Sequence, residues 1–146
     1  MTTAADVLKS KPQQTVHTIT PTATVLEAVK LMADKNIGAL LVMEGTQIAG
    51  IVTERDYARK VAVMSRSSRE TSVREIMTSA VMYVRPDQSS EECMALMTEN
   101  RLRHLPVMDR DKLLGLISIG DLVKNIISEQ KFLIQQLEHY ITGERG

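Results

Sequence analysis

The chain has 146 residues, 43% of them hydrophobic, which is enough for one compact domain of about 100–150 residues. The 18 basic and 18 acidic side chains cancel, so bulk charge offers no attraction to nucleic acid or to an anionic membrane. Cys93 is the single cysteine, which excludes an intrachain disulfide, and no apolar run approaches the roughly 18 residues that span a bilayer, so we expect a reducing cytoplasm.

The first half of the chain predicts a strand, a helix, two strands and a second helix. Its strands are short and apolar, and they cover Val16 to Ile19, Leu40 to Met43 and Ile48 to Val52. Thr24 and Glu27 have the spacing of a capping box, a hydroxyl and a carboxylate that satisfy the main-chain donors at a helix start. The second helix should begin at Thr53 or Glu54.

The second half predicts the same elements in the same order. Its strands cover Val81 to Val84, Leu105 to Met108 and Leu113 to Ile117. Ser89 and Glu92 form the matching capping box. The polar stretch from Ser65 to Thr71 is typical of a connection, so we place it between the halves.

One motif occurs twice. Gly50-Ile51-Val52-Thr53-Glu54-Arg55-Asp56 is matched by Gly115-Leu116-Ile117-Ser118-Ile119-Gly120-Asp121, at a constant offset of 65 residues that needs no gap from Val16 to Ile126. An ungapped match of this length indicates duplication, and two copies suit half-domains that share one core. We therefore expect an α+β (α/β) fold of two pseudo-symmetric repeats packed through their sheets, with a C-terminal helix extension.

The repeated motif has two explanations. A hydroxyl three residues before an aspartate, as in Thr53 and Asp56, is a capping box in its own right. The same geometry also suits a nucleotide, because an aspartate accepts hydrogen bonds from a ribose hydroxyl pair while a helix start favours phosphate. Arg55 would then neutralise phosphate charge, and Gly120 at the equivalent place would not. Two unequal sites are expected.

Other site chemistry is missing from the sequence. No His, Cys, Asp or Glu cluster has metal-ligand spacing, and neither a Gly-x-Gly-x-x-Gly nor a Walker lysine motif occurs. The sequence shows no nucleophile, base and acid that would form one catalytic set. Asp56 and Asp121 belong to separate motifs, so they are poor candidates for an acid/base pair. We predict that the protein is not an enzyme and has no metal site.

With these motifs the chain resembles a known family, the tandem cystathionine-β-synthase (CBS) domain pair, or Bateman module. The two heptads resemble the family's ribose-phosphate motif, Val73-Arg74-Glu75-Ile76-Met77-Thr78 resembles the lead-in to a second repeat, and Arg103-His104-Leu105-Pro106-Val107 resembles its middle strand. The resemblance covers about Asp6 to Ile127. It implies repeats over 6–64 and 73–127, a linker over 65–72 and a helical extension over 128–146.

The resemblance implies a stand-alone regulatory module with an adenine nucleotide in two clefts between the repeats. AMP is the first ligand expected, with NAD(H), ADP, ATP or S-adenosylmethionine as alternatives. The implied Asp56 site contains Ile51, Thr53, Arg55, Asp56, Thr78, Met82, Leu102 and Arg103. The implied Asp121 site contains His17, Ile37, Gly38, His104, Leu116, Ser118, Gly120 and Asp121. Each histidine, viewed alone, also fits a structural role.

The last predicted helix runs past the repeat, from Asp121 to about Ile141. Its apolar residues form two rows at helical spacing, which is more than one small domain needs to bury. The helix could pack on another subunit or fold back on its own domain. We expect a homodimer and an effector protein as partners. The alternative function is a nucleotide-independent interaction module that uses this helix.

Overall fold

The computed structural model describes residues 1–12 and 15–142. They form two compact units, which are described separately. Unit 1 holds the N-terminal segment, Val84–Asp109 and the chain from Leu113 onward, and unit 2 holds Thr15–Tyr83 with Arg110–Lys112. Within the described residues, no helix combines the length and the hydropathy that a membrane span requires.

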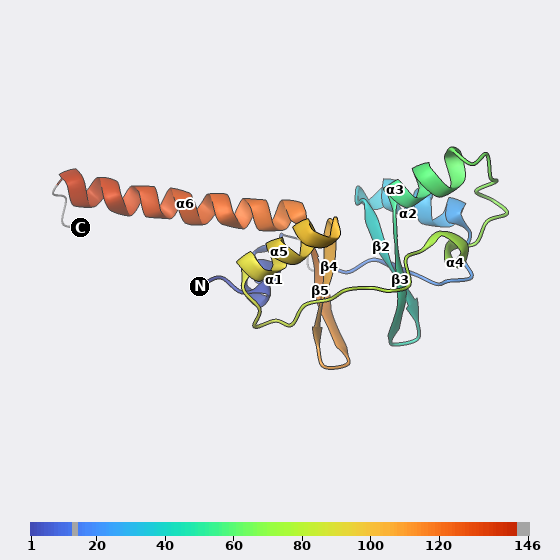
Figure 1. Cartoon of the computed structure of the whole chain (residues 1–146), viewed down its shortest axis with the longest axis horizontal. Coiled ribbons are helices and arrows are strands. Elements are labelled where there is room, and N and C mark those ends of the chain that lie inside the picture. The colour runs from blue at the N-terminus through green and yellow to red at the C-terminus, as the bar shows by residue number, and fades with distance from the viewer. Residues whose placement is uncertain (13–14, 143–146) are drawn as a thin grey trace. The chain divides into compact units, whose positions relative to one another are not determined.

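Unit 2 contains a three-stranded sheet in the order β1-β2-β3. Its strands are β1 (Thr18–Ile19), β2 (Ala39–Glu44) and β3 (Gln47–Thr53), and its helices are α2 (Val25–Lys35), α3 (Glu54–Tyr57), the π-helical turn η1 (Ala58–Ala62) and α4 (Val73–Ile76). β1 runs parallel to β2. β2 is antiparallel to β3 (Figure 1), and Leu41 lies opposite Ile51 in the register. The predicted capping box at Thr24 and Glu27 is present, so helix α2 begins where the sequence indicated.

One face of helix α2 covers the sheet of unit 2. Val25, Ala28 and Met32 recur at helical spacing and are all buried. They pack in one core cluster with side chains from the strands, η1 and α4: Leu40, Val42, Val52, Val61, Val73 and Ile76. This core fixes the end of β3, where the first copy of the repeated motif lies.

Unit 1 is built from α1 (Ala4–Ser10), α5 (Ser90–Asn100), β4 (His104–Asp109), β5 (Lys112–Ser118) and α6 (Ile119–Thr142). The N-terminal segment lies beside the start of α5, because the main-chain N–H of Ala4 donates to Gln88 O at 2.8 Å and that of Ser90 donates to Thr2 O at 2.9 Å. Helix α1 therefore packs with the second half of the chain, although the family resemblance assigned residues from Asp6 to the first repeat.

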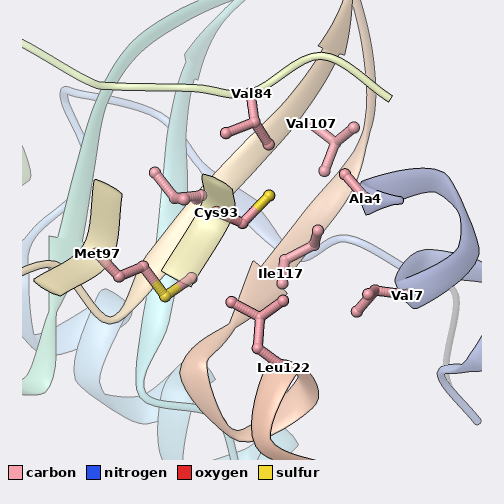
Figure 2. Close-up of a cluster of buried hydrophobic side chains, with 9 residues drawn as sticks. Ala4, Val7, Val84, Cys93, Met97, Val107, Ile117 and Leu122 are labelled. Atoms are coloured by element: carbon pink, nitrogen blue, oxygen red, sulfur yellow. The ribbon is translucent and has the colours of Figure 1, made fainter. Parts of the chain in front are cut away.

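Cys93 lies in the core of unit 1. Figure 2 shows its side chain among those of Val84, Met97 and Ile117. The other members of the cluster are Ala4, Val7, Leu105, Val107 and Leu122. Burial raises the pKa of the Cys93 thiol, and the neighbouring Glu92 carboxylate adds to the shift. A buried thiol with a raised pKa is a packing group rather than a nucleophile.

The two halves differ where the sequence predicted a strand over Val81 to Val84. That prediction is wrong except at Val84, which forms one parallel bridge to Val107. The N–H of Val84 donates to Pro106 O, and Val84 O accepts from Met108, both at 2.9 Å. Met82 and Tyr83 are 38% and 57% exposed, so the preceding residues have no buried face that would extend the pairing.

Candidate functional site

The first copy of the repeated motif is a capping box at the end of β3. Thr53 Oγ1 accepts the Asp56 N–H at 3.1 Å, and Asp56 Oδ2 accepts both the Thr53 N–H at 2.9 Å and the Thr53 hydroxyl at 3.1 Å. The main chain at Thr53 is extended, with φ −127° and ψ 163°, which ends the strand and begins α3. The structural explanation for this motif is therefore realised in full.

The second copy repeats that geometry at the end of β5. Asp121 Oδ2 accepts the Ser118 N–H at 2.8 Å, and Ser118 Oγ accepts the Asp121 N–H at 3.1 Å. The same arrangement occurs at Thr3 and Asp6, which the resemblance does not place in a site. The hydroxyl–aspartate geometry alone thus does not distinguish a ligand site from a helix cap, and the surroundings must do so.

Unlike the aspartate of an ordinary helix cap, each candidate aspartate also has a lysine ammonium beside its carboxylate. Lys60 Nζ lies 3.1 Å from Asp56 Oδ1 and also donates to Ile76 O at 2.8 Å. Lys11 Nζ lies 3.0 Å from Asp121 Oδ2 and donates to Leu116 O at 2.7 Å. The two aspartate side chains are only 14% and 19% exposed. Each half-buried carboxylate is therefore neutralised by a cation that a main-chain carbonyl also holds.

The two lysines come from different places in the chain. Lys60 follows Asp56 by four residues, whereas Lys11 is the C-terminal cap of α1 and is distant from Asp121 in the sequence. Asn125 stands where a counterpart of Lys60 would be, and its buried Oδ1 has no hydrogen-bond partner within the described chain. The aspartates are equivalent by sequence, but the cations beside them are not.

The charge around Asp121 shifts two pKa values. Burial, the largest influence, raises the pKa of Asp121, but the Ser118 N–H and the Lys11 ammonium outweigh it, so the pKa is lower than usual. For His104, burial is again the largest influence and lowers the pKa, Lys11 and Arg103 lower it further, and Asp121 opposes them. His104 is therefore neutral and Asp121 ionised at neutral pH.

We predict that His104 makes the folded protein less stable in mild acid. Folding lowers the pKa of His104. The contribution of neutral His104 to the free energy of unfolding is therefore complete above the pKa of the unfolded state, about 6.5, and is lost as pH falls toward the pKa of the folded state. An NMR titration of the His104 ring should give a pKa below 6.5, and Lys11→Met should raise it because a nearby positive charge is removed. A value at or above 6.5 in the wild-type protein would contradict the prediction.

The remaining residues of the predicted Asp56 site divide between the units. Ile51 and Thr78 are together in unit 2, where their main chains exchange two hydrogen bonds of 3.0 and 2.9 Å. Arg55 is exposed on α3 and Met82 is exposed after α4. Leu102 and Arg103 belong to unit 1, where Leu102 packs on the core and the Arg103 carbonyl accepts the Ile119 N–H at 2.8 Å.

The predicted Asp121 site divides in the same way. Unit 1 holds Ser118, Asp121, Leu116, His104 and Gly120. Of these, Asp121 and the Leu116 carbonyl contact Lys11, and its charge acts on His104. A Cβ at Gly120 would meet Ser118 Oγ at an ordinary 3.6 Å, so packing does not require glycine there. The others, His17, Ile37 and Gly38, lie in unit 2. There the Gly38 carbonyl accepts the Glu54 N–H at 3.0 Å, next to the helix of Asp56.

Sequence reasoning missed both lysines. Lys60 carried a usable signal, because an acid and a base four residues apart meet on one helix face. Lys11 carried none, since it reaches Asp121 only through the packing of α1 in unit 1. Among residues 1–12 and 15–142, no group of three or more His, Cys, Asp or Glu side chains is arranged to hold a metal ion.

A family model for the CBS domain matches this chain twice, over residues 4–63 and 73–128. The chain belongs to the CBS domain family. The structure is similar to that of a putative signal-transduction protein with CBS domains from Burkholderia ambifaria, at 62% identity, a TM-score of 0.85 and coverage of 88% of this chain and 96% of the other. Proteins built from a CBS domain pair are typically regulatory rather than catalytic.

Two further CBS domain proteins extend the comparison. The mitochondrial protein CBSX3 of Arabidopsis thaliana is 42% identical over 150 residues, which span 97% of this chain and 73% of the relative. The structure of CBSX2, solved in complex with AMP, covers 89% of this chain and 99% of its own at 24% identity and a TM-score of 0.73. At that identity the CBSX2 likeness shows the fold alone.

Proposed function

We propose that this CBS domain protein is a non-catalytic regulatory module that binds an adenine nucleotide at the Asp56 site and the Asp121 site. The observation that carries the proposal is the lysine held against each capping aspartate, at 3.0 and 3.1 Å. A carboxylate that accepts hydrogen bonds from the ribose hydroxyls would also repel the phosphate of the same nucleotide. The lysine cancels that charge, so the aspartate can accept ribose hydroxyls next to an anion.

The two sites are proposed to differ in occupancy. At Asp56 the cap uses Oδ2 and Lys60 uses Oδ1, so both carboxylate oxygens have a partner. At Asp121 the cap and Lys11 both bond to Oδ2. In addition, α6 is long enough to have a substantial helix dipole at Ser118, whereas α3 has only four residues before the π-helical turn. We therefore expect the Asp121 site to bind more tightly.

The proposed output is a change of conformation that a partner protein detects. A ligand shifts such an equilibrium only by its difference in affinity for the two states. Because Lys11 joins α1 to the end of β5 through Asp121 and Leu116, a nucleotide phosphate that shares the Lys11 ammonium with Asp121 would weaken the hydrogen bond to the Leu116 carbonyl. Displacement of α1 is thus a physical route from binding to a signal.

Calorimetric titration tests this function, with AMP as the first ligand and ADP, ATP and NAD(H) beside it. Asp121→Ala should weaken binding at least tenfold, since it removes a charge-assisted pair of hydrogen bonds worth about 1.5–3 kcal/mol. Asp56→Ala should remove the weaker binding event. Unchanged binding in the double variant, or no binding by the wild-type protein, would overturn the proposal.

The test needs controls, because each aspartate also caps a helix. Glu27→Ala removes a capping box in unit 2, and Glu92→Ala removes the carboxylate that accepts the Ser89 hydroxyl at the start of α5 in unit 1. Neither glutamate belongs to a proposed site. All four variants should lose some stability, because each removes a carboxylate from the first turn of a helix. Only the aspartate variants should lose affinity. Mass spectrometry of molecules that co-purify with the protein would identify the resident ligand.

A second candidate function is a nucleotide-independent interaction module, and the exposed apolar side chains of α6 favour it. Thermal unfolding separates the two candidates. A nucleotide-binding module gains about 2.7 kcal/mol at a ligand concentration 100 times the Kd, whereas an interaction module does not respond.

A further inference from the structure

The chain from Thr2 to Lys11, which we name the N-terminal strap, lies along the first part of α6. At the end of the strap, Lys11 Nζ lies 3.0 Å from Asp121 Oδ2. At its beginning, the Thr2 hydroxyl donates to Glu129, which lies further along the same helix than Asp121. The strap therefore runs antiparallel to α6. Every residue from Ile127 to Ile141 is exposed, so beyond the strap α6 does not fold back on its own domain.

Little apolar surface holds the strap in unit 1. Its fully buried residues are Ala4 and Val7, which belong to the core cluster shown in Figure 2. Detachment of the strap removes these two side chains from the core, whereas unfolding of the unit also removes Met97, Leu105 and Ile117. The main-chain hydrogen bonds between the strap and the start of α5 contribute little net stability, because water replaces them when the segment detaches.

Two buried polar atoms without a partner lie beside the strap. Among the residues that the structure describes, Ser90 Oγ and Asn125 Oδ1 are buried and accept or donate no hydrogen bond. The Ser90 N–H donates to Thr2 O at 2.9 Å, so Ser90 is next to the beginning of the strap. Asn125 lies one turn from both Asp121 and Glu129, on the face of α6 that the strap covers. A buried polar atom without a partner costs free energy that contact with water restores.

We propose that the N-terminal strap opens as one unit while the rest of unit 1 stays folded. Opening removes few apolar side chains from the core, and it lets water reach the Ser90 hydroxyl and the Asn125 amide. Both effects make the free energy of opening small compared with the free energy of unfolding the unit. The strap opens without a nucleotide, so this inference goes beyond the function proposed above and does not depend on it.

Opening of the strap changes the charge at the Asp121 site. The closed strap places the Lys11 ammonium against the Asp121 carboxylate and the Leu116 carbonyl. In the open state the ammonium moves away with the strap, and Asp121 keeps its capping bond from the Ser118 N–H. The strap is therefore a conformational switch that adds or removes one positive charge at the start of α6.

Hydrogen exchange followed by NMR in the nucleotide-free protein tests the opening. The N–H groups of Ala4 and Val7 are hydrogen-bonded in the closed strap. We expect their protection factors to be at least about tenfold below that of the Met97 N–H, in the middle of α5. Low concentrations of urea should leave exchange at Val7 unchanged, since opening exposes little surface. Equal protection at Val7 and Met97 would overturn the proposal.

Removal of the unpaired polar atoms tests why the strap opens. Ser90→Ala and Asn125→Leu should each slow exchange at Val7 about 5- to 100-fold, because the closed state then buries one unpaired polar atom fewer. The matched control is Ser89→Ala. The Ser89 hydroxyl is also buried but accepts the Glu92 N–H at 3.1 Å, so its removal should not slow exchange. Unchanged or faster exchange in both Ser90→Ala and Asn125→Leu would contradict this cause of opening.

Lys11→Met connects the strap to the Asp121 site. The variant removes the ion pair that helps to close the strap, so exchange at Val7 should become about 2- to 5-fold faster. Unchanged exchange would show that the position of the strap and the charge at Asp121 are not coupled. None of these measurements contains a nucleotide, so a protein that binds no nucleotide would leave every expected result in place.

Discussion

Replacement of Leu40 by alanine is expected to lower the free energy of unfolding by about 2–5 kcal/mol. Leu40 is fully buried in β2, where it packs with Met32 and Val52, and the truncation leaves a cavity that the sheet cannot close. Leu105 has the equivalent position in unit 1 and is also fully buried. Leu105→Ala should therefore cost a similar amount in urea unfolding followed by circular dichroism.

Leu114→Ala is the matched control for the leucine substitutions. Leu114 is 39% exposed on β5, and the first copy of the repeat has an alanine, Ala49, at the equivalent position. Its truncation should cost less than about 1 kcal/mol, because less apolar surface is lost from the core. Equal losses in Leu40→Ala and Leu114→Ala would show that the core assignment is wrong.

The glycines that open the two motifs are expected to respond differently to alanine. A Cβ at Gly50 would lie 2.7 Å from the carbonyl oxygen of Thr78, which main-chain hydrogen bonds to Ile51 hold in place. The backbone must shift, at a cost of about 1–3 kcal/mol. A Cβ at Gly115 would lie 2.7 Å from Leu8 Cδ2, the end of a flexible side chain that can change rotamer.

Gly115→Ala is therefore expected to cost less than Gly50→Ala, although the two positions are equivalent by sequence. Thermal unfolding of the two variants in parallel measures the difference, and the Gly50→Ala protein should have the lower Tm. The reverse order would mean that Leu8 is less free to move than the Thr78 main chain. Because Thr78 belongs to the proposed Asp56 site, Gly50→Ala should also weaken nucleotide binding there, whereas Gly115→Ala tests packing against α1.

The repeat made the fold and the capping aspartates predictable from sequence. A capping box depends on residues three apart, so Thr53 with Asp56 and Ser118 with Asp121 could be identified without tertiary information. The strand predicted over Val81 to Val84 failed because strand length depends on a neighbour and a buried face, which local pattern does not supply. Only Val84 has both, in its bridge to Val107.

Contacts between distant segments could not be predicted. Helix α1 packs against α5 and α6, far along the chain, and this placement brings Lys11 to Asp121. The sequence predicted two unequal sites because Arg55 in the first motif is replaced by Gly120 in the second. The structure adds a difference of another kind, between a lysine in the π-helical turn that follows α3 and a lysine that is distant from Asp121 in the sequence.

The capping bonds on Asp56 and Asp121 also have a consequence for the entropy of binding. A free carboxylate side chain must be ordered when it binds a ligand, at a cost of about 0.5–1.5 kcal/mol. Here the Thr53 and Ser118 N–H groups already hold the two carboxylates in one rotamer each. The side-chain entropy is therefore lost during folding and not during ligand binding. The aspartates are thus preorganised for the proposed nucleotide and should move little when it binds. In the proposed mechanism, motion begins at the lysines, whose longer side chains have more rotatable bonds than the aspartates.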